Sequence, residues 1–407
     1  MKILYVINQI SDWSGDSGLL WLTVKLMKKR GHEVAIATTD GNPFRDKESV
    51  LKYSKMIKDL SKSNESSIKI NDIPVFKVHC ISSNFGMYSP NAGKIAKKII
   101  RNYDLIHIYS WYHHIGIEFF KSAKKYNIPL IFTAMGTLQN DAQSFYKTQK
   151  SIIDYIYTKK IIDYASILHS VGHSEIESYI QYGGKKEKII QVENGIDLKD
   201  FELTSSTDIL KRLELEEKSY ILFLSRIHPK KGLELLLSAF KKLTQNNHEI
   251  YLVVAGSGEK DYLQKIQKNV KELSLTNKVK FTGLVSQDEK ITLLKSAKIF
   301  SLTSKSDIHP RAIQEALTMG VPVVISKESD YPEVEEFNAG KIVSLNENNI
   351  SETFEKLLDS NDELKIQSNN AKKLIKEKFL AEEQIKKFEK IYFNILSNGK
   401  NNFSRKE

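Results

Sequence analysis

The chain has 407 residues, of which 41% are hydrophobic and 27% are charged. This composition excludes a disordered protein, and the length predicts two domains, because a single core seldom grows beyond roughly 250–300 residues. The one cysteine, Cys80, excludes an internal disulfide and suits a reducing cytosol. No stretch approaches the ~20 apolar residues that cross a membrane, and the first residues predict a strand rather than a signal peptide.

The net charge of +11 indicates an anionic partner. Charge alone leaves open a nucleic acid, an anionic membrane surface and a phosphorylated substrate. The lysines are spread over predicted helices, and no nucleic-acid-binding motif is recognisable. We therefore expect no nucleic-acid partner.

Strands and helices are predicted to alternate along nearly the whole chain, which is typical of parallel α/β sheets. In the first half, strands are predicted at residues 3–7, 33–38, 105–109, 129–134, 167–170 and 189–193. In the second half, they are predicted at residues 220–225, 250–255, 279–282, 299–303, 321–325 and 340–344. Residues 42–72 are polar and predict a helix followed by a mobile loop.

Two such sets of strands predict two Rossmann-like domains. The first domain is expected over residues 1–197 and the second over residues 219–378, with a linker at 198–218, where the apolar periodicity lapses. Residues 379–407 predict a terminal helix that packs back on the N-terminal domain and ends in a frayed tail.

Residues 304–326 predict a loop, a short helix and a strand. Asp307 comes just before this helix and Glu315 lies two turns into it. Pro310 suits the first helical turn, and Gly320 is placed to end the helix. Such a helix N-terminus can attract an anion, although an ordinary β-α-β unit with surface carboxylates fits the pattern equally well.

Two cations follow the first strand of the second domain. Arg226 and Lys231 lie at the carboxyl end of the strand at 220–225, where open α/β sheets bind ligands. Both side chains suit phosphate oxygens, and cations before a helix oppose its dipole unless an anion is bound. The sequence has no Asp-x-Asp pair, so these cations would neutralise a pyrophosphate without a metal.

Two glycine turns also follow strands, one around Gly15 and one at Gly256-Ser257-Gly258. Glycine lets the backbone approach a ligand closely. Neither turn has the G-x-G-x-x-G spacing of a dinucleotide site, so a tight turn explains each at least as well.

Several segments arrive in an order and spacing that resemble glycosyltransferase family 4. They are LSRIHPKKGLELLLSAF, VVAGSG, VKFTGLV and SDIHPRAIQEALTMGVPVV, with weaker matches at residues 30–34 and 192–197. The resemblance covers nearly all of residues 1–395. It implies an α/β GT-B fold, with two Rossmann-like domains whose parallel sheets face each other across a cleft. It also implies a retaining, metal-independent transfer of a sugar from a nucleoside-diphosphate donor, with UDP favoured over GDP.

The same resemblance assigns donor-side residues. Arg226 and Lys231 would bind the diphosphate and stabilise its charge, and Glu315 would accept hydrogen bonds from the ribose. Asp307 would be the third catalytic residue, although the family usually has glutamate there. The remaining donor-side residues are Gly15, Gly256, Leu284, His309, Pro310, Arg311 and Ala312.

The acceptor side is less clear. Met135 stands where many family members have a histidine, and the Gly-x-Leu that follows it resembles a subgroup that builds bacterial surface polysaccharides. The candidate acceptor-side residues are Trp111, His113, His114, Gly136 and Thr137. A structural role is the commoner one for a lone histidine. Residues 93–103 predict a basic amphipathic helix, which is either an ordinary Rossmann helix or a contact with an anionic membrane.

The resemblance implies a cytoplasmic hexosyltransferase, either free or bound at the inner face of the cell membrane. It would add one sugar to a glycan or lipid-linked glycan during lipopolysaccharide or capsule assembly, with no cofactor and no metal. A GT-B nucleotide-sugar epimerase, a phosphorylase and a non-catalytic nucleotide-sugar-binding scaffold are alternatives.

Overall fold

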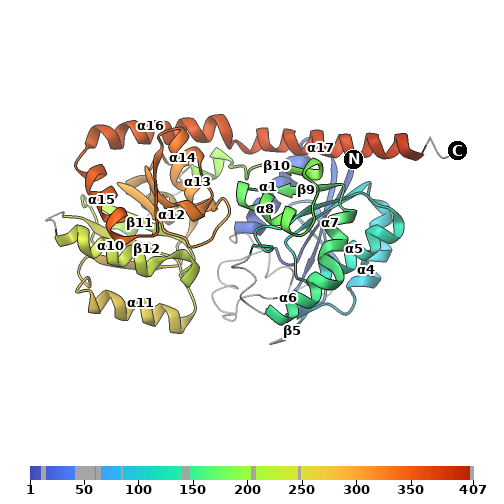
Figure 1. Ribbon diagram of the computed structural model, residues 1–407, viewed down its shortest axis with the longest axis horizontal. Helices are drawn as coiled ribbons and strands as arrows, with labels where there is room; N and C mark the ends of the chain where they lie inside the picture. The colour runs from blue at the N-terminus through green and yellow to red at the C-terminus, as the bar shows by residue number, and fades with distance from the viewer. Residues whose placement is uncertain are drawn as a thin grey trace. The chain divides into compact units, whose positions relative to one another are not determined.

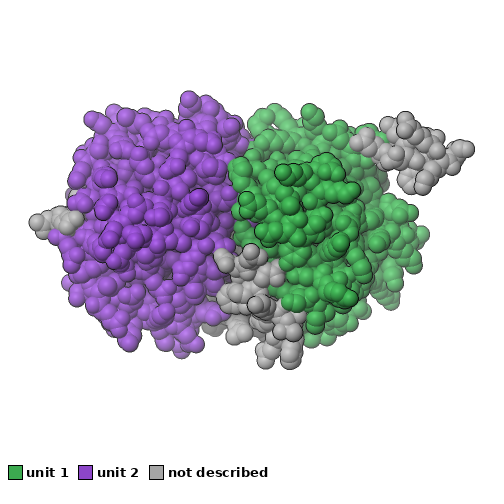
Figure 2. Space-filling view, in the orientation of Figure 1, with its two compact units in different colours: residues 1–195, 381–407 green, residues 196–380 purple. Residues whose placement is uncertain are grey.

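The computed structural model describes residues 1–10, 15–41, 60, 66–83, 86–139, 147–202, 208–245 and 249–403. The chain forms two compact units, shown in different colours in Figure 2. Unit 1 comprises Met1–Gly195 and Ala381–Glu407, and unit 2 comprises Ile196–Leu380. The described residues of the predicted linker belong to unit 2, where Phe201, Ile209 and Leu215 are buried.

Unit 1 is built on an eight-stranded sheet in the order β10-β9-β8-β7-β1-β2-β4-β3. All neighbours in it are parallel except β3 and β4. Its strands are β1 (Lys2–Ile7), β2 (Glu33–Thr39), β3 (Ser67–Ile70), β4 (Ile73–Val78), β7 (Leu105–Tyr109), β8 (Leu130–Thr133), β9 (Ile167–Ser170) and β10 (Ile189–Gln191). A separate hairpin pairs β5 (Ile81–Ser83) with β6 (Gly86–Tyr88).

The six strands predicted in the first half are therefore confirmed. The helix and loop predicted over residues 42–72 are wrong for residues 66–72, which contain β3. Alternation of Ile68 and Ile70 with polar residues lets this short edge strand pair with β4. Apart from Leu60, the rest of that prediction lies outside the described residues.

The helices of unit 1 follow its strands in the usual α/β pattern (Figure 1). They are α1 (Gly15–Lys29), α4 (Ala92–Ile99), α5 (His114–Tyr126), α6 (Lys147–Ile153), α7 (Lys159–Tyr164), α8 (His173–Gln181) and α17 (Ala381–Phe403). A π-helical turn, Asp154–Thr158, joins α6 to α7. Across the described ranges of the chain, no helix combines the length and the apolar character that crossing a membrane requires.

The last helix, α17, is part of unit 1 because one face of it enters the core. Ile385, Phe388 and Tyr392 recur at helical spacing and are buried with the side chains of β1. Burial of each such side chain is worth roughly 1.5–3 kcal/mol. Glu389 of the same helix pairs with Arg30 and, at 2.8 Å, with His32 at the end of α1.

Unit 2 has a six-stranded parallel sheet in the order β13-β12-β11-β14-β15-β16. Counted along the unit, this is the 3-2-1-4-5-6 order of a Rossmann fold. Its strands are β11 (Tyr220–Leu224), β12 (Tyr251–Ala255), β13 (Val279–Gly283), β14 (Ile299–Leu302), β15 (Val323–Ser326) and β16 (Gly340–Val343). The six strands predicted in the second half and the α/β fold class are confirmed. The strand order reverses between β11 and β14, and such sheets bind ligands at that point.

Helices cover both faces of this sheet. The strand order runs outward from β11 in both directions, and right-handed connections that run in opposite directions lie on opposite faces. They are α9 (Ile209–Arg212), α10 (Leu233–Gln245), α11 (Lys260–Glu272), α12 (Gln287–Ser296), α13 (Arg311–Thr318), α14 (Glu333–Glu336), α15 (Glu347–Leu358) and α16 (Asn361–Lys378). Pro310 is the N-cap of α13, one position before the predicted first turn. Gly320 ends α13 as predicted, with a positive φ of 74° and the two hydrogen bonds of a Schellman motif.

A chain of hydrogen bonds runs through the core of unit 1. His169 Nε2 donates to the Val192 carbonyl at 2.8 Å, so its Nδ1 accepts from Thr133 at 2.7 Å. Thr133 in turn accepts from His107 Nε2 at 2.6 Å, and Tyr392 donates to His107 Nδ1 at 2.7 Å. These hydrogen bonds keep the imidazoles of His107 and His169 neutral, and they connect α17 to β7, β8 and β9.

Acidification is expected to destabilise unit 1 below about pH 6.5. Burial lowers the pKa of His113 and of His169 to about 4 and the pKa of His107 well below its ordinary value. Below the ordinary pKa of histidine, the unfolded chain binds protons that the folded chain does not. The free energy of unfolding therefore decreases by up to about 1.4 kcal/mol for each histidine when the pH is lowered by one unit. All three tryptophans lie within residues 1–195, so tryptophan fluorescence during urea unfolding reports on unit 1 alone.

The variant His169→Asn should reduce the slope of this pH dependence, whereas His173→Asn, at an exposed position of α8, should leave it unchanged. Equal slopes in the wild type and in His169→Asn between pH 4.5 and 6.5 would contradict the assignment.

Candidate functional site

The loops that follow β11 and β14 are held together at the point where the strand order of unit 2 reverses. Thr303 donates to the Gly232 carbonyl at 3.0 Å, and the Lys305 amide donates to the Lys230 carbonyl at 2.7 Å. Gly232 has φ 68°, and a Cβ there would lie 1.8 Å from the Thr303 carbonyl oxygen. Only glycine permits this approach.

The Gly256-Ser257-Gly258 turn joins the same edge of the sheet. A Cβ at Gly256 would lie 2.0 Å from the Ser225 carbonyl oxygen, and one at Gly258 would lie 2.0 Å from that of Ile227. The Gly256 amide also donates to the Gly283 carbonyl at 2.9 Å, beside the half-buried Leu284. Both glycines are thus explained by close backbone packing, and the turn brings Leu284 to the edge that carries Arg226.

The charged groups at this edge form one specific ion pair. Lys231 Nζ contacts Asp307 Oδ2, which also accepts a hydrogen bond from Ser304 at 3.0 Å. The Asp307 amide donates to the Glu328 carbonyl at 2.9 Å, which fixes the loop that carries it. The predicted Lys231 and Asp307 therefore lie together, with the shorter aspartate in direct contact with the lysine.

Arg226 lies at the same edge but is arranged differently. Its side chain is exposed, and it makes no hydrogen bond or ion pair with any residue that the structure describes. Partial burial lowers the pKa of the neighbouring His228, and the charges of Arg226 and Lys230 lower it further. Arg226, Lys230 and Lys231 act together on His228 against the one opposing charge of Glu259, and such a group of cations favours an anionic ligand.

His309 is held inside unit 2 rather than presented to a ligand. It adopts φ 48°, and its buried ring stacks on Tyr331 with centroids 3.8 Å apart and packs edge-on against Phe379. The ring therefore anchors the loop before α13. The predicted contacts of His309, Pro310 and Ala312 with a donor would have to come from their backbone groups.

Glu315 is a buried carboxylate between two cations. Its side chain is on α13, and its Oε1 accepts from Lys290 at 2.8 Å and from Arg311 at 3.2 Å. Burial works to raise the pKa of Glu315, but Lys290 and Arg311 outweigh it and hold that pKa below its ordinary value. The carboxylate is thus ionised at neutral pH, and its Oε2 accepts no hydrogen bond within the described part of the chain.

Lys290 is the residue at this site that the sequence analysis missed. It lies in the first turn of α12, whose start is fixed by a capping box between Ser286 and Glu289. That capping pattern predicts the start of the helix. Nothing in the spacing predicts that Lys290 meets a carboxylate 25 positions later.

The candidate acceptor-side residues follow strands of unit 1. Trp111 is buried and donates to Thr158 at 2.8 Å. His113 is the N-cap of α5, where its Nδ1 accepts from the Gly116 amide at 3.0 Å, while its Nε2 faces the Tyr109 carbonyl at 3.2 Å. His114 is half-buried and contacts the Ser89 carbonyl at 3.0 Å. The packing of Trp111 and His113 is that of structural residues.

A buried carboxylate holds the turn that follows β8. The Gly136 amide donates to Glu175 at 2.8 Å, and the Val171 amide donates to the other carboxylate oxygen at 2.9 Å. Thr137 closes the turn by donating to the Ala134 carbonyl at 2.6 Å. Glu175 is fully buried and was not predicted, because a glutamate in the first turn of a helix is common for electrostatic reasons alone.

The structure therefore groups the predicted residues by unit. Arg226, Lys231, Gly256, Leu284 and Asp307 follow the carboxyl ends of strands in unit 2, and α13 carries Arg311 and Glu315. In unit 1, Gly15 begins α1 after β1, and the acceptor-side candidates follow β7 and β8. Among the described residues, no three histidine, cysteine, aspartate or glutamate side chains cluster as metal ligands would.

Known proteins match both units. Residues 205–374 match the family model described as glycosyl transferases group 1, and residues 20–200 match the one described as glycosyltransferase family 4. An uncharacterized glycosyltransferase of Methanocaldococcus jannaschii is 27% identical over 330 residues, which cover 76% of this chain and 82% of that protein. The N-acetyl-α-D-glucosaminyl L-malate synthase of Bacillus anthracis is 23% identical over 95% of this chain and 96% of its own length.

Among solved structures, Anabaena Alr3699/HepE in complex with UDP-glucose has a TM-score of 0.75 at 19% sequence identity. The comparison covers 97% of this chain and 100% of that one, so the two share one fold. The two family models together span most of the chain and meet near the boundary between the units. This chain therefore belongs to glycosyltransferase family 4 and is a hexosyltransferase with the GT-B fold.

Proposed function

We propose that this glycosyltransferase moves a sugar from a UDP-sugar to a growing cell-surface glycan, with retention of anomeric configuration and without a metal. The observation that carries the proposal is the charge arrangement at the β11–β14 edge. There an exposed Arg226 stands beside a Lys231 that Asp307 orients. This arrangement supplies one unpaired cation and one cation held in a fixed orientation where a diphosphate would lose the sugar.

In the proposed reaction, the bond between the anomeric carbon and the diphosphate oxygen breaks and the acceptor oxygen takes its place on the same face. Negative charge then grows on the departing diphosphate. Arg226 and Lys231 would stabilise this charge, because donors fixed in advance cost no reorganisation during the reaction. The departing phosphate oxygen would take the acceptor proton, so no histidine base is required.

Glu315 would hold the nucleoside. It is ionised and buried, and its Oε2 is open to hydrogen bonds from ribose hydroxyls. Lys290 and Arg311 hold it in place through Oε1. The choice of UDP is supported by Anabaena Alr3699/HepE, whose structures contain UDP or UDP-glucose.

An anionic membrane surface is the proposed setting, since a lipid-linked acceptor would lie there. The helix predicted over residues 93–103 includes α4, whose Ala92, Ala96 and Ile99 are buried in the core. Its exposed residues are Lys94, Lys97 and Lys98, which favours an ordinary Rossmann helix over an inserted one.

A second surface of unit 1 supports membrane contact better. Ile152, Tyr155 and Ile156 recur at helical spacing along α6 and the π-helical turn, and all three are exposed, Tyr155 at 91%. Lys159 and Lys160 follow them and are also exposed. An apolar stripe next to basic residues fits the interface of an anionic leaflet.

The nucleotide site is tested by calorimetry with UDP, GDP and ADP, with and without Mg²⁺. We expect UDP to bind without metal, and Glu315→Gln to weaken this binding by about tenfold or more, because a charged hydrogen-bond acceptor is lost. Glu336→Gln, an exposed glutamate of the same unit, is the matched control. Preference for GDP or ADP would change the proposed donor, and binding of none of the three would favour the scaffold.

The catalytic cations are tested by kinetics. Arg226→Ala and Lys231→Ala should each lower kcat by about 10²–10³-fold, the usual effect of removing one donor to a developing charge. Lys271→Ala on α11 should not. The anomeric configuration of the product, read by NMR, should match that of the donor. An unchanged kcat in both variants would remove the proposed role, and slow release of an epimerised free donor would favour the epimerase.

Membrane contact is tested by sedimentation with vesicles of phosphatidylcholine alone or mixed with phosphatidylglycerol. Ile152→Ser combined with Tyr155→Ser should reduce binding to the anionic vesicles by about tenfold, because each apolar side chain is worth roughly 1.5–3 kcal/mol when fully buried. Ile366→Ser, an exposed position in unit 2, serves as the control. If Ile152→Ser/Tyr155→Ser bound the anionic vesicles as tightly as Ile366→Ser does, this stripe would be excluded as the contact.

A further inference from the structure

A groove of about 680 Å³ opens on unit 2 at the edge of the sheet opposite the loops that follow β11 and β14, which are called the donor loops below. It lies beside Lys298, which precedes β14, and beside the turn at residues 320–322, which precedes β15. The donor loops follow the other ends of these strands. The groove is therefore separate from the site described above.

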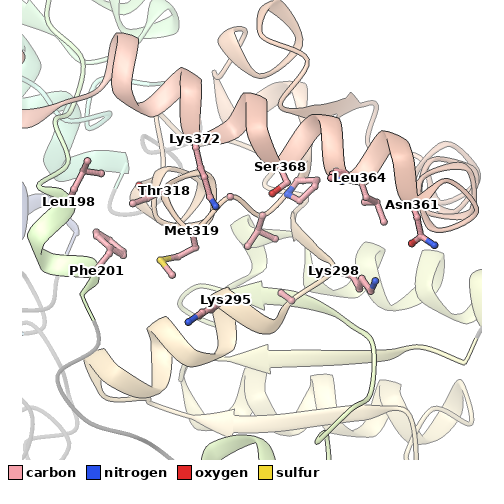
Figure 3. Close-up of a pocket in the computed structure, with 15 residues that line it drawn as sticks. Leu198, Phe201, Lys295, Lys298, Thr318, Met319, Asn361, Leu364, Ser368 and Lys372 are labelled. Carbon is pink, nitrogen blue, oxygen red and sulfur yellow. The ribbon is translucent and has the colours of Figure 1, made fainter.

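The two walls of the groove carry lysines. One face of α16 forms one wall, since Asn361, Leu364, Lys365, Ser368 and Lys372 recur at helical spacing and all line it. Lys295 at the end of α12 and Lys298 form the other wall. Figure 3 shows Lys372 reaching down from α16 and Lys295 on the opposite side, with Met319 between them.

These four lysines are not neutralised by the protein. Each is exposed, and none makes a hydrogen bond or ion pair with a residue in the described part of the chain. Among the described residues that line the groove there is no aspartate or glutamate. By contrast, Lys341 and Lys242 elsewhere in unit 2 pair with glutamates. The groove thus concentrates uncompensated positive charge in a concave surface.

A simpler explanation is that the lysines balance helix dipoles. Lys295 is in the last turn of α12, and Lys372 lies against Gly320 at the end of α13, where a Cβ would be 2.4 Å from its Cε. Each helix C-terminus carries only about half a negative charge. Two such ends offset about one of the four lysine charges, so most of the positive charge is left.

Apolar side chains also line the groove. Among them are Phe201, Met319 and Leu364, of which Phe201 and Leu364 are largely buried. The volume falls within the range of about 300–1,000 Å³ that is typical of small-molecule sites. Apolar side chains suit the carbon skeleton of a ligand, while the lysines suit groups with concentrated negative charge such as phosphates.

We propose that this groove binds a small organic molecule that carries two or more phosphate groups. Its carbon skeleton would lie over Phe201 and Met319, and its phosphates would contact Lys365 and Lys372 on one side and Lys295 and Lys298 on the other. This ligand is distinct from the sugar donor.

The probe is fructose 1,6-bisphosphate, titrated into the full chain by calorimetry at 0.15 M NaCl. We expect one binding site, weakened by about tenfold or more in Lys365→Gln/Lys372→Gln, because hydrogen bonds to two charged donors are lost. The matched control Lys268→Gln/Lys271→Gln removes the same charge from α11, which does not line the groove. It should bind as the wild type does.

The variant Arg226→Ala/Lys231→Ala tests whether the probe binds at the donor cations instead of in the groove. It should bind the probe with the affinity of the wild type. Loss of binding in that variant, or equal affinity in the wild type and Lys365→Gln/Lys372→Gln, would overturn the proposal. Absence of binding at 0.15 M NaCl would overturn it as well. Equally tight binding of inorganic phosphate would show an unspecific anion site and exclude the organic ligand. None of these outcomes depends on whether UDP binds.

Discussion

The contact on which the rest of unit 2 depends is the approach of the loop after β11 to the loop after β14. Gly232 makes it possible, because any side chain there would collide with the Thr303 carbonyl. Once the two loops touch, Lys231 reaches Asp307 and Arg226 is left facing solvent at the same edge. The positive charge at the candidate site is thus a consequence of backbone packing. It is set at a point where the sheet reverses its strand order and where the carboxyl ends of neighbouring strands diverge.

Charge is organised in unit 2 in two different ways. At the candidate site, Lys231, Lys290 and Arg311 are each paired with a carboxylate, which fixes their position and shields them from one another. In the groove at the opposite edge, the four lysines have no ion-pair partner within the described part of the chain. A paired cation is oriented and suits a single geometry. An unpaired and mobile one suits ligands whose charges vary in spacing. The net charge of +11 therefore includes both kinds of cation.

The sequence predicted twelve of the fourteen strands in the two sheets, because each of these is a short apolar run bounded by turn residues, and such a run can be recognised without knowledge of tertiary contacts. It also predicted that Arg226, Lys231 and Asp307 belong to one site, through the order of motifs along the chain. It did not predict β3 and β4, whose short apolar alternations lie beside a polar, lysine- and serine-rich segment, nor Lys290 and Glu175, whose partners lie far away in sequence. His309 shows the limit most clearly. Its position in the motif predicts a role in donor binding, whereas the stacking of its ring on Tyr331 makes it part of the core.

Because α17 belongs to unit 1, the two units are completed at different times during synthesis. Unit 2 is one continuous segment, Ile196–Leu380, and every strand and helix that it needs has left the ribosome once Leu380 has emerged. Unit 1 begins first but cannot bury Tyr5 and His107 against Phe388 and Tyr392 until the last helix is made. Part of one apolar face of its sheet, the part that α17 covers, must therefore stay exposed while almost two hundred residues are translated. The part of the chain that is made first would be the last to reach its final stability, and it is the part that chaperones would have most reason to hold.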